Sequence, residues 1–212
     1  GLFKIRNDTE FAIIEMGANN FGEIAFLTSI CEPDYGYITN FGKAHLEGFI
    51  NIDGVIKAKT EMYGWIINND KTILINGDDE NQKKYDDHKH IIFGSNNNYK
   101  YSFKEDDNDF VNVLFNGFLF ETNIYGTYNY SNVCAAIALG LEFGIDKNEI
   151  NHSLKIYQSK NNRSEVVKVG DKRIILDAYN ANPTSMEEAI KSFSMLNGDK
   201  AIILGDMFEL GD

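Results

Sequence analysis

Residues 35–76 read YGYITNFGKAHLEGFINIDGVIKAKTEMYGWIINNDKTILIN, and this stretch decides the fold class. Its two ends, residues 35–39 and 71–76, are short apolar runs typical of strands buried on both faces. Between them, residues 52–67 have the apolar spacing of an amphipathic helix. A strand, a helix and a second strand in this order predict a parallel pair joined by a right-handed crossover.

The same alternation continues on both sides of this stretch. Residues 11–16 form a continuous apolar run that predicts another buried strand, and residues 22–27 predict a helix after it. Residues 90–94 predict a further strand. Together these elements favour an α/β fold with a mostly parallel sheet flanked by helices.

The pattern changes after residue 96. Three runs alternate between apolar and polar residues: 99–103, 110–115 and 118–122. Asn116 and Gly117 separate the last two, and Asn-Gly between alternating runs is the strongest short hairpin signal. We therefore expect an antiparallel β-ribbon added to the parallel sheet, followed by helices over 132–143 and 147–157.

A polar, aperiodic segment at residues 159–162 predicts a linker between two domains. The elements expected beyond it are a hairpin of strands 165–169 and 172–176, a helix over 183–196 and a buried strand over 200–205. We expect one domain over 1–160 and the beginning of a second over 161–212. About fifty residues are fewer than an α/β domain usually has, so the second domain is expected to be cut short.

The composition excludes several classes of protein. Lys and Arg number 20 against 32 Asp and Glu, a net charge of −12, which argues against a nucleic-acid partner because phosphates are neutralised by clustered Lys and Arg. No apolar run approaches the roughly 18 residues of a membrane helix, and the first residues show no signal-peptide pattern. Cys31 and Cys134 lie far apart, as expected of reduced thiols. We expect a soluble protein of the cytoplasm with no membrane insertion.

Polar side chains stand at the ends of two predicted strands. Glu15 lies at the end of 11–16, and Asn40 and His45 follow 35–39. Open α/β sheets bind ligands at the carboxyl ends of their strands, where a carboxylate and an imidazole can share a divalent cation. The alternative is that Glu15 caps the next helix and His45 is a surface residue.

Lys59 occupies an unusual position on the predicted helix 52–67. The apolar stripe of this helix consists of Ile52, Ile56, Lys59, Tyr63 and Ile66. A lysine on a core-facing stripe has a lowered pKa and can react as a neutral amine, for example with carbon dioxide to give a metal-binding carbamate. The alternative is that its aliphatic stem packs while the ammonium reaches water; Lys57 lies off the stripe and is most simply solvated.

No phosphate-binding loop of the G-x-x-x-x-G-K-[ST] or G-x-G-x-x-G type is present in the sequence. Other local signals are Asn129 and Asn132 before a predicted helix, Arg163 after the linker, and a polar turn at 177–183. Two asparagines at a helix start can read the edge of a base through amide hydrogen bonds. The alternative is that they are helix caps.

Taken in order, eight stretches resemble the Mur ligase family. They are IIEMGANNFGEI (13–24), ITNFGKAHLEGF (38–49), AKTEMY (58–63), INGDD (75–79), GTYNYSNVCAAIALG (126–140), NNRSEV (161–166), LDAYNANPTSMEEA (176–189) and ILGDMFELG (203–211). The resemblance spans nearly the whole chain. It implies a P-loop-type central ATP-binding domain over 1–160 and the beginning of a Rossmann-like C-terminal domain over 161–212.

The resemblance implies an ATP-dependent ligase that forms an amide bond through an acyl phosphate. The NANPTSM and LGDMFELG stretches favour the branch of the family that adds D-Ala-D-Ala to UDP-MurNAc-tripeptide during synthesis of the peptidoglycan precursor. The implied cofactors are ATP and Mg²⁺, and we expect a monomer.

The resemblance also implies a magnesium site. By motif match, its ligands are Glu15, His45 and a carbamylated Lys59, with Asn40 supporting the same loop. Both chemical steps gather negative charge, so catalysis is expected to depend on positioning and on cations. The stripe argument reaches Lys59 independently.

Further roles are implied around the nucleotide. Asn129 and Asn132 match the segment beside the adenine, Arg163 matches a contact to the nucleotide phosphates, and Asp177 matches the acid that binds the ribose. The turn near the reacting ends of the substrates is matched by Tyr179, Asn180 and Asn182.

The sequence departs from the family pattern at several points. Tyr128 stands where many relatives carry His, and NNR around Arg163 replaces the commoner GR. The family's UDP-binding domain and phosphate loop would precede Gly1, so we expect this polypeptide alone not to turn over ATP. Alternatives are another superfamily ligase such as a folylpolyglutamate synthetase, a non-catalytic nucleotide-binding or scaffold module, and a metal hydrolase using Glu15 and His45.

Overall fold

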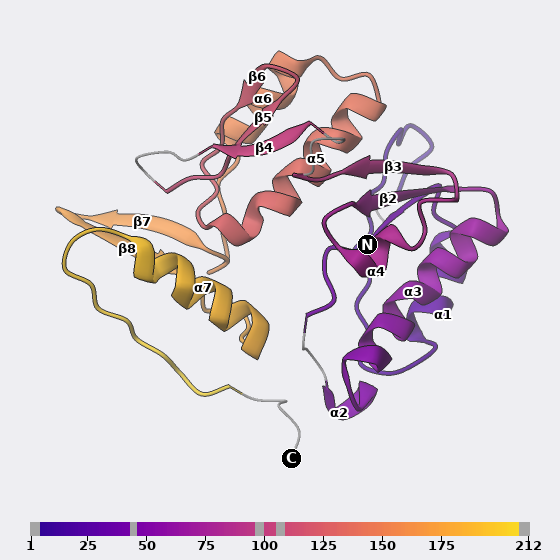
Figure 1. Ribbon diagram of the computed structural model, residues 1–212, viewed down its shortest axis with the longest axis horizontal. Helices are drawn as coiled ribbons and strands as arrows, with labels where there is room; N and C mark the ends of the chain where they lie inside the picture. Colours follow the sequence, from indigo (N-terminus) through magenta and orange to yellow (C-terminus); the bar gives the residue numbers. More distant parts are fainter. Residues whose placement is uncertain (1–4, 43–45, 96–99, 105–108, 208–212) are drawn as a thin grey trace.

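The computed structural model of the chain describes residues 5–42, 46–95, 100–104 and 109–207. At its centre, β1 (Tyr35–Tyr37), β2 (Thr72–Asn76) and β3 (His90–Phe93) form a parallel sheet in the order β1-β2-β3 (Figure 1). The middle strand β2 is buried from Thr72 to Ile75 because helices pack on both faces of the sheet. The predicted α/β class and parallel pairing are confirmed.

One face of the sheet is covered by α1 (Glu23–Cys31) and α3 (Ile52–Asn68) (Figure 1). The side chains buried between them and the sheet are Ile24, Ile38, Met62, Tyr63, Ile66, Ile73 and Ile75. Glu61 of α3 accepts hydrogen bonds from the backbone N–H groups of Gly22 and Ala25, at 2.9 and 3.1 Å, which ties the start of α1 to α3. Short helices α2 (Leu46–Phe49) and α4 (Glu80–Lys83) lie in the connections.

The other face is covered by α5 (Tyr130–Glu142), which follows the short 3₁₀ helix η2 (Thr127–Asn129). Beyond α5 lies an antiparallel sheet of β4 (Tyr101–Lys104), β5 (Asn112–Phe115) and β6 (Phe118–Phe120), and α6 (Lys147–Ile156) packs against both (Figure 1). Asn116 and Gly117 both have positive φ, 48° and 78°, as a two-residue hairpin turn requires. The predicted ribbon is therefore present, as three strands.

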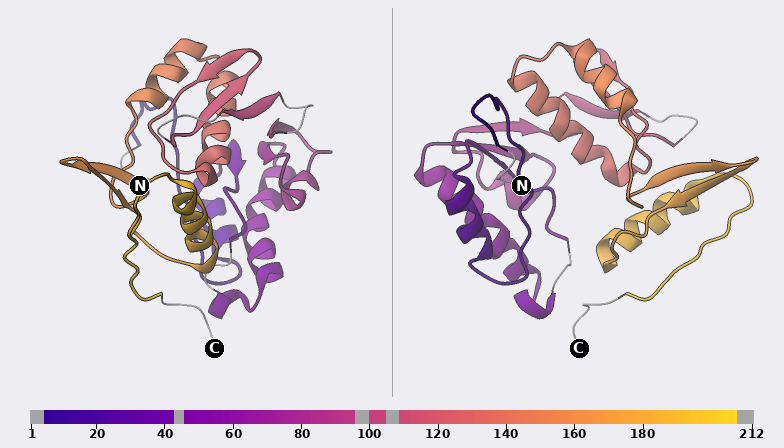
Figure 2. Two further views of the ribbon diagram at one scale, coloured as in Figure 1. Left: turned by 60° about the vertical axis from the view of Figure 1, so that its left-hand side comes forward. Right: turned by 180° about the vertical axis from the view of Figure 1, so that it is seen from behind.

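The C-terminal part consists of the antiparallel pair β7 (Glu165–Val169) and β8 (Lys172–Leu176) followed by α7 (Pro183–Met195). Figure 2 shows this part set apart from α1 and α3, and α7 packs against η2. Arg173 of β8 also forms an ion pair with Asp109, at 2.9 Å. The hairpin and helix predicted after the linker are confirmed.

Two predicted strands are wrong. Residues 11–16 and 200–205 form no strand, and their large side chains are exposed, with Ile13 and Ile203 each 98% accessible. A buried strand needs a hydrogen-bonded neighbour and cover on both faces. In the described part of the chain, neither run is hydrogen-bonded to a strand of any sheet. Glu15 consequently lies in an unpaired segment rather than at the end of a strand.

None of the helices in the described part of the chain has both the length and the apolar character needed to cross a bilayer.

Candidate functional site

Lys59 lies half-buried at the border of the buried face of α3. The fully buried positions of this helix are Gly54, Val55, Ala58, Met62, Tyr63 and Ile66. From its place beside them, the Lys59 Nζ donates a 2.7 Å hydrogen bond to the backbone carbonyl of Asn40. Burial lowers the pKa of the Lys59 ammonium below its usual value. Lys59 is thus partly buried at the border of this face rather than on its central stripe, and its role at the site stays a prediction.

The loop that follows β1 folds over Lys59 and meets the start of α7. The Oδ1 of Asn40 accepts a 3.0 Å hydrogen bond from the backbone N–H of Gly42, a local turn that holds the Asn40 carbonyl toward α3. A Cβ placed on Gly42 would lie 3.8 Å from the Cβ of Thr184 in the first turn of α7. The structure therefore brings Asn40 and Lys59 close to the segment that contains Asn182.

The remaining predicted metal ligands are less well placed. Glu15 is exposed, and its neighbour Met16 packs on the same core cluster as Phe41, which follows Asn40. His45 lies outside the described residues. Among the residues that are described, no three His, Cys, Asp or Glu side chains are grouped as a metal site would require. The carboxylate of Glu15 suits Mg²⁺, which prefers oxygen ligands, but the set of Glu15, His45 and Lys59 stays a prediction.

Asn129 and Asn132 are joined by their side chains at the start of α5. The Nδ2 of Asn132 donates to the Oδ1 of Asn129 at 3.1 Å, and the Nδ2 of Asn129 donates to the backbone carbonyl of Tyr125 at 2.9 Å. Asn129 occupies the N-cap position of α5, yet its side chain makes no capping hydrogen bond. Side-chain capping therefore does not account for Asn129, and the two amides form an ordered pair on one turn.

Arg163, Asp177 and Tyr179 meet where the linker enters the hairpin. The guanidinium of Arg163 lies over the ring of Tyr179, 3.7 Å from its centroid. The carbonyl of Asn162 accepts hydrogen bonds from the backbone N–H groups of Ala178 and Tyr179, at 2.9 and 3.1 Å. The Asn162 carbonyl thus holds the end of the linker beside the turn at 177–183.

Ser164 connects this cluster to η2. Its backbone N–H donates to the Oδ1 of Asp177 at 3.0 Å, and its hydroxyl lies 2.7 Å from the hydroxyl of Tyr128. Tyr128 precedes Asn129, so a single side-chain hydrogen bond links the asparagine pair to the cluster around Asp177. The predicted nucleotide-side residues, from two segments more than thirty positions apart, are brought together.

Two other predicted residues have local partners. The Oδ1 of Asn180 accepts from the backbone N–H of Ala181 at 2.9 Å. Asn182 is the N-cap of α7: its Oδ1 accepts from the backbone N–H of Ser185 at 2.9 Å, and the Ser185 hydroxyl accepts from the Asn182 N–H. The capping alternative thus applies to Asn182.

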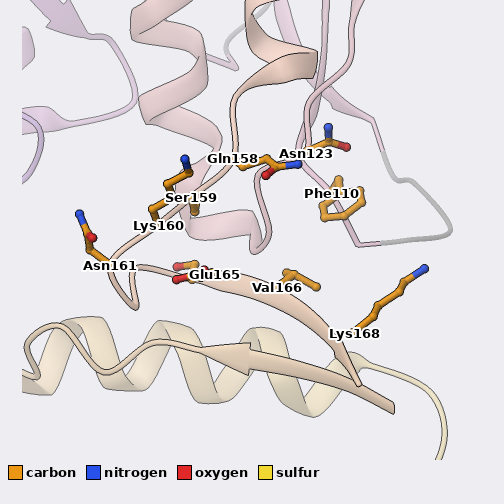
Figure 3. A pocket seen from close by; sticks show the side chains of 10 residues that line it. Phe110, Asn123, Gln158, Ser159, Lys160, Asn161, Glu165, Val166 and Lys168 are labelled. Atoms are coloured by element: carbon orange, nitrogen blue, oxygen red, sulfur yellow. The ribbon is translucent and has the colours of Figure 1, made fainter. Parts of the chain in front are cut away.

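A cavity of about 690 Å³ lies behind this cluster, between the linker, β7 and the segments that carry Phe110 and Asn123 (Figure 3). Its polar lining includes Gln158, Lys160 and Glu165. None of the predicted site residues lines it, and it touches the cluster only at Ser164.

Comparison with protein families decides the identity of the fold. The sequence profile of the Mur ligase middle domain matches residues 2–140, and that of the Mur ligase, glutamate ligase domain matches residues 162–212. The chain belongs to the Mur ligase family.

Individual relatives of this Mur ligase chain are similar over its whole length. The UDP-N-acetylmuramoyl-tripeptide–D-alanyl-D-alanine ligase of Bacillus subtilis (strain 168) is 34% identical over 211 residues, 97% of this chain and 46% of the relative. The structure of MurF from Acinetobacter baumannii has a TM-score of 0.85 at 28% identity and covers 100% of this chain and 48% of that one. MurF from Thermotoga maritima, solved in complex with ADP, shares the fold, with a TM-score of 0.79 at 22% identity and coverage of 92% and 47%. The chain spans about half the length of the relatives it matches.

Two structurally important residues of this Mur ligase chain were missed from the sequence. Ser164 carries no local signal, because its role depends on contacts with Tyr128 and Asp177. Gln82 is fully buried: its Nε2 donates to the carbonyl of Ile38 at 2.8 Å, and its Oε1 accepts from the N–H of Asn76 at 2.9 Å. Gln82 therefore ties together the carboxyl ends of β1 and β2, from which the loop of Asn40 emerges.

Proposed function

We propose that this chain carries the nucleotide-binding centre of a cytoplasmic ligase that uses ATP to add D-Ala-D-Ala to UDP-MurNAc-tripeptide. The observation that carries the proposal is the hydrogen bond between Tyr128 and Ser164, which unites the asparagine pair with Arg163 and Asp177. The names of the relatives support the choice of substrates, and the ADP complex of the Thermotoga relative supports a nucleotide. Together, the names of the relatives and the ADP complex favour the member of the Mur ligase family that adds D-Ala-D-Ala.

The proposed nucleotide contacts follow from the chemistry of the side chains. Paired amides offer both donors and acceptors, which suits the edge of an adenine ring. Asp177 is exposed and keeps its second oxygen available for a ribose hydroxyl. Arg163 is stacked on Tyr179, which restricts a flexible cation to one place and lowers the entropy lost when it binds a phosphate.

The proposed metal site surrounds Lys59. A buried lysine with a lowered pKa supplies the neutral amine that adds to carbon dioxide, forming a C–N bond and releasing a proton to leave a carbamate. Glu15, His45 and this carbamate would then hold Mg²⁺. When bound, the cation would balance the charge of the phosphates, which an acidic chain with a net charge of −12 needs.

The reaction that we propose has two transfers. The terminal carboxylate of the tripeptide takes the γ-phosphoryl group of ATP, which releases ADP and leaves an acyl phosphate. The amine of D-Ala-D-Ala then attacks the acyl carbon, loses a proton and expels phosphate as the amide forms. The residues of this chain bind and orient the reacting groups, which is the main source of rate in such transfers.

We also propose that residues 1–160 and 161–212 belong to separate domains and that the protein is a monomer. The boundary is supported by the positive φ angles of Asn161, Asn162 and Ser164, which mark an irregular linker. It is further supported by the independent two-stranded sheet of β7 and β8.

The experiment that tests the proposal uses the natural gene product containing these residues, with ATP, Mg²⁺ and UDP-MurNAc-tripeptide. Amine acceptors are compared one at a time: D-Ala-D-Ala, L-Ala, D-Glu and L-Glu. We expect ADP release only with D-Ala-D-Ala, together with a product whose mass equals tripeptide plus dipeptide minus water.

The other outcomes favour the alternatives. ADP release with L-Glu when a folate replaces UDP-MurNAc-tripeptide would indicate a folylpolyglutamate synthetase. Tight ATP binding without ADP release in the presence of any acceptor would indicate a non-catalytic module. Hydrolysis of UDP-MurNAc-tripeptide in the absence of ATP would indicate a metal hydrolase. Each of these results contradicts the proposal.

A further inference from the structure

Tyr128, one of the departures from the family pattern, lies inside a hydrogen-bond network. It lies in η2, two residues after Gly126, whose φ of 89° belongs to the left-handed region that favours glycine. A Cβ on Gly126 would collide with the ring of Tyr128. The ring therefore lies against bare backbone, and its hydroxyl is aimed at Ser164.

The hydrogen bonds of this network run in one direction. The carboxylate of Asp177 can only accept, so the Ser164 hydroxyl, 3.4 Å from its Oδ1, donates toward it. The oxygen of Ser164 is then left to accept from the hydroxyl of Tyr128 at 2.7 Å. Burial raises the pKa of Tyr128 to about 12, so this hydroxyl keeps its proton at neutral pH.

The network fixes one oxygen of Asp177 and leaves the other open. The Oδ1 takes hydrogen bonds from both the backbone N–H and the hydroxyl of Ser164, which is itself buried. Among the described residues, none donates to the Oδ2. A carboxylate anchored through one oxygen presents the other in a defined direction, and the following residue pair, Ala178 and Tyr179, is held by Asn162.

We propose that Tyr128 is a positioning residue that orients the Asp177 carboxylate through Ser164 and registers the β7–β8 hairpin against the asparagine pair of α5. This inference rests on the proposed function, because its consequence is the affinity for ATP. Tyr128 touches no substrate in this account; it acts through Ser164. The arrangement depends on a tyrosine, because its hydroxyl extends from η2 to the hydroxyl of Ser164, directly before β7.

The test measures KM for ATP, KM for D-Ala-D-Ala and kcat of the natural gene product in Tyr128→Phe, Ser164→Ala and the double variant. We expect each single variant to raise KM for ATP about five- to tenfold, the loss of roughly one hydrogen bond, and to leave KM for D-Ala-D-Ala unchanged. The double variant should match the larger single effect, because both changes break one chain of bonds. Tyr157→Phe, which alters an exposed tyrosine at the end of α6, is the control.

Amide hydrogen exchange of Ser164 in the same proteins separates the two levels of the proposal. Tyr128→Phe should speed exchange of the Ser164 N–H about fivefold or more, because the loop that holds it loosens. If Tyr128→Phe speeds exchange of the Ser164 N–H but the natural gene product does not use ATP, the proposed function is refuted. The hydrogen-bond network of Tyr128, Ser164 and Asp177 then still stands. An unchanged KM for ATP, additive effects in the double variant, or unchanged exchange would overturn the role of Tyr128.

Discussion

The ammonium nitrogen of Lys59 lies 2.7 Å from the backbone carbonyl oxygen of Asn40, so the helix α3 and the loop after β1 meet at a half-buried cation. This contact holds the Lys59 side chain beside the loop that follows β1. The charge of Lys59 can be tested through the pH dependence of the protein's stability.

Lys59→Met is expected to change how stability depends on pH. Since burial lowers the pKa of Lys59, the unfolded chain binds this proton more tightly than the folded chain. The charged lysine therefore lowers the free energy of unfolding at neutral pH, and this penalty disappears as pH rises toward the unfolded value near 10.5. We predict that the Tm gain of Lys59→Met over the wild type is larger at pH 7 than at pH 10. Lys57→Met, exposed on the same helix, is the control, and an equal trend there would contradict the prediction.

Gln82→Leu is expected to destabilise the chain by about 2–4 kcal/mol, because two buried backbone groups lose their hydrogen bonds. The affected groups are the carbonyl of Ile38 and the N–H of Asn76. Urea unfolding at neutral pH measures the change. Gln158→Leu, on the exposed linker, should change stability by less than about 0.5 kcal/mol. Equal stability of the two variants would show that the buried amide does not hold the strand ends.

Asn182 allows a structural role to be separated from a substrate role. Asn182→Ala removes the cap of α7 and should cost about 1 kcal/mol of stability, whereas Asn182→Asp keeps a capping oxygen and should unfold like the wild type. If the amide N–H group also serves the substrates, Asn182→Asp should still lower kcat/KM by about tenfold. Wild-type activity of Asn182→Asp would limit Asn182 to the cap.

The stacked pair of Arg163 and Tyr179 predicts an effect on nucleotide affinity. Loss of an exposed cation–π contact is worth about 0.5–1 kcal/mol, so Tyr179→Leu should raise KM for ATP roughly two- to fivefold. Tyr179→Phe keeps the aromatic ring and should raise it less. Equal effects of the two substitutions would show that the ring face is not what holds Arg163.

Much of the fold could be predicted because its elements are locally encoded. The helix α3 repeats its apolar residues at the helical period, and β5 and β6 alternate around Asn116 and Gly117. The strand predictions over residues 11–16 and 200–205 are wrong for a different reason. Their apolar runs meet the local requirements of a strand, but a strand also needs a hydrogen-bonded neighbour, and in the described residues neither run pairs with a strand.

The candidate site likewise combines features that local sequence predicts with features that depend on distant contacts. Spacing predicts that Lys59 is near the buried face of α3, but its position at the border of that face and its partner, the carbonyl of Asn40, depend on tertiary packing. Whether Asn129 caps α5 could not be predicted from the sequence; its side chain makes no capping hydrogen bond, and its role at a nucleotide site stays a prediction. Ser164 is invisible in the sequence, because both of its partners, Tyr128 and Asp177, are more than ten positions away.

The central claim is that one nucleotide site is assembled from the start of α5 and from the segments carrying Arg163 and Asp177. Photolabelling of the natural gene product with 8-azido-ATP, followed by peptide mass mapping, tests it most directly. The account predicts label on the peptide containing Asn129 and Asn132, suppressed by excess ATP and reduced in Asp177→Ala. Specific label confined to the cavity beside Gln158 and Lys160, or label indifferent to Asp177→Ala, would contradict it.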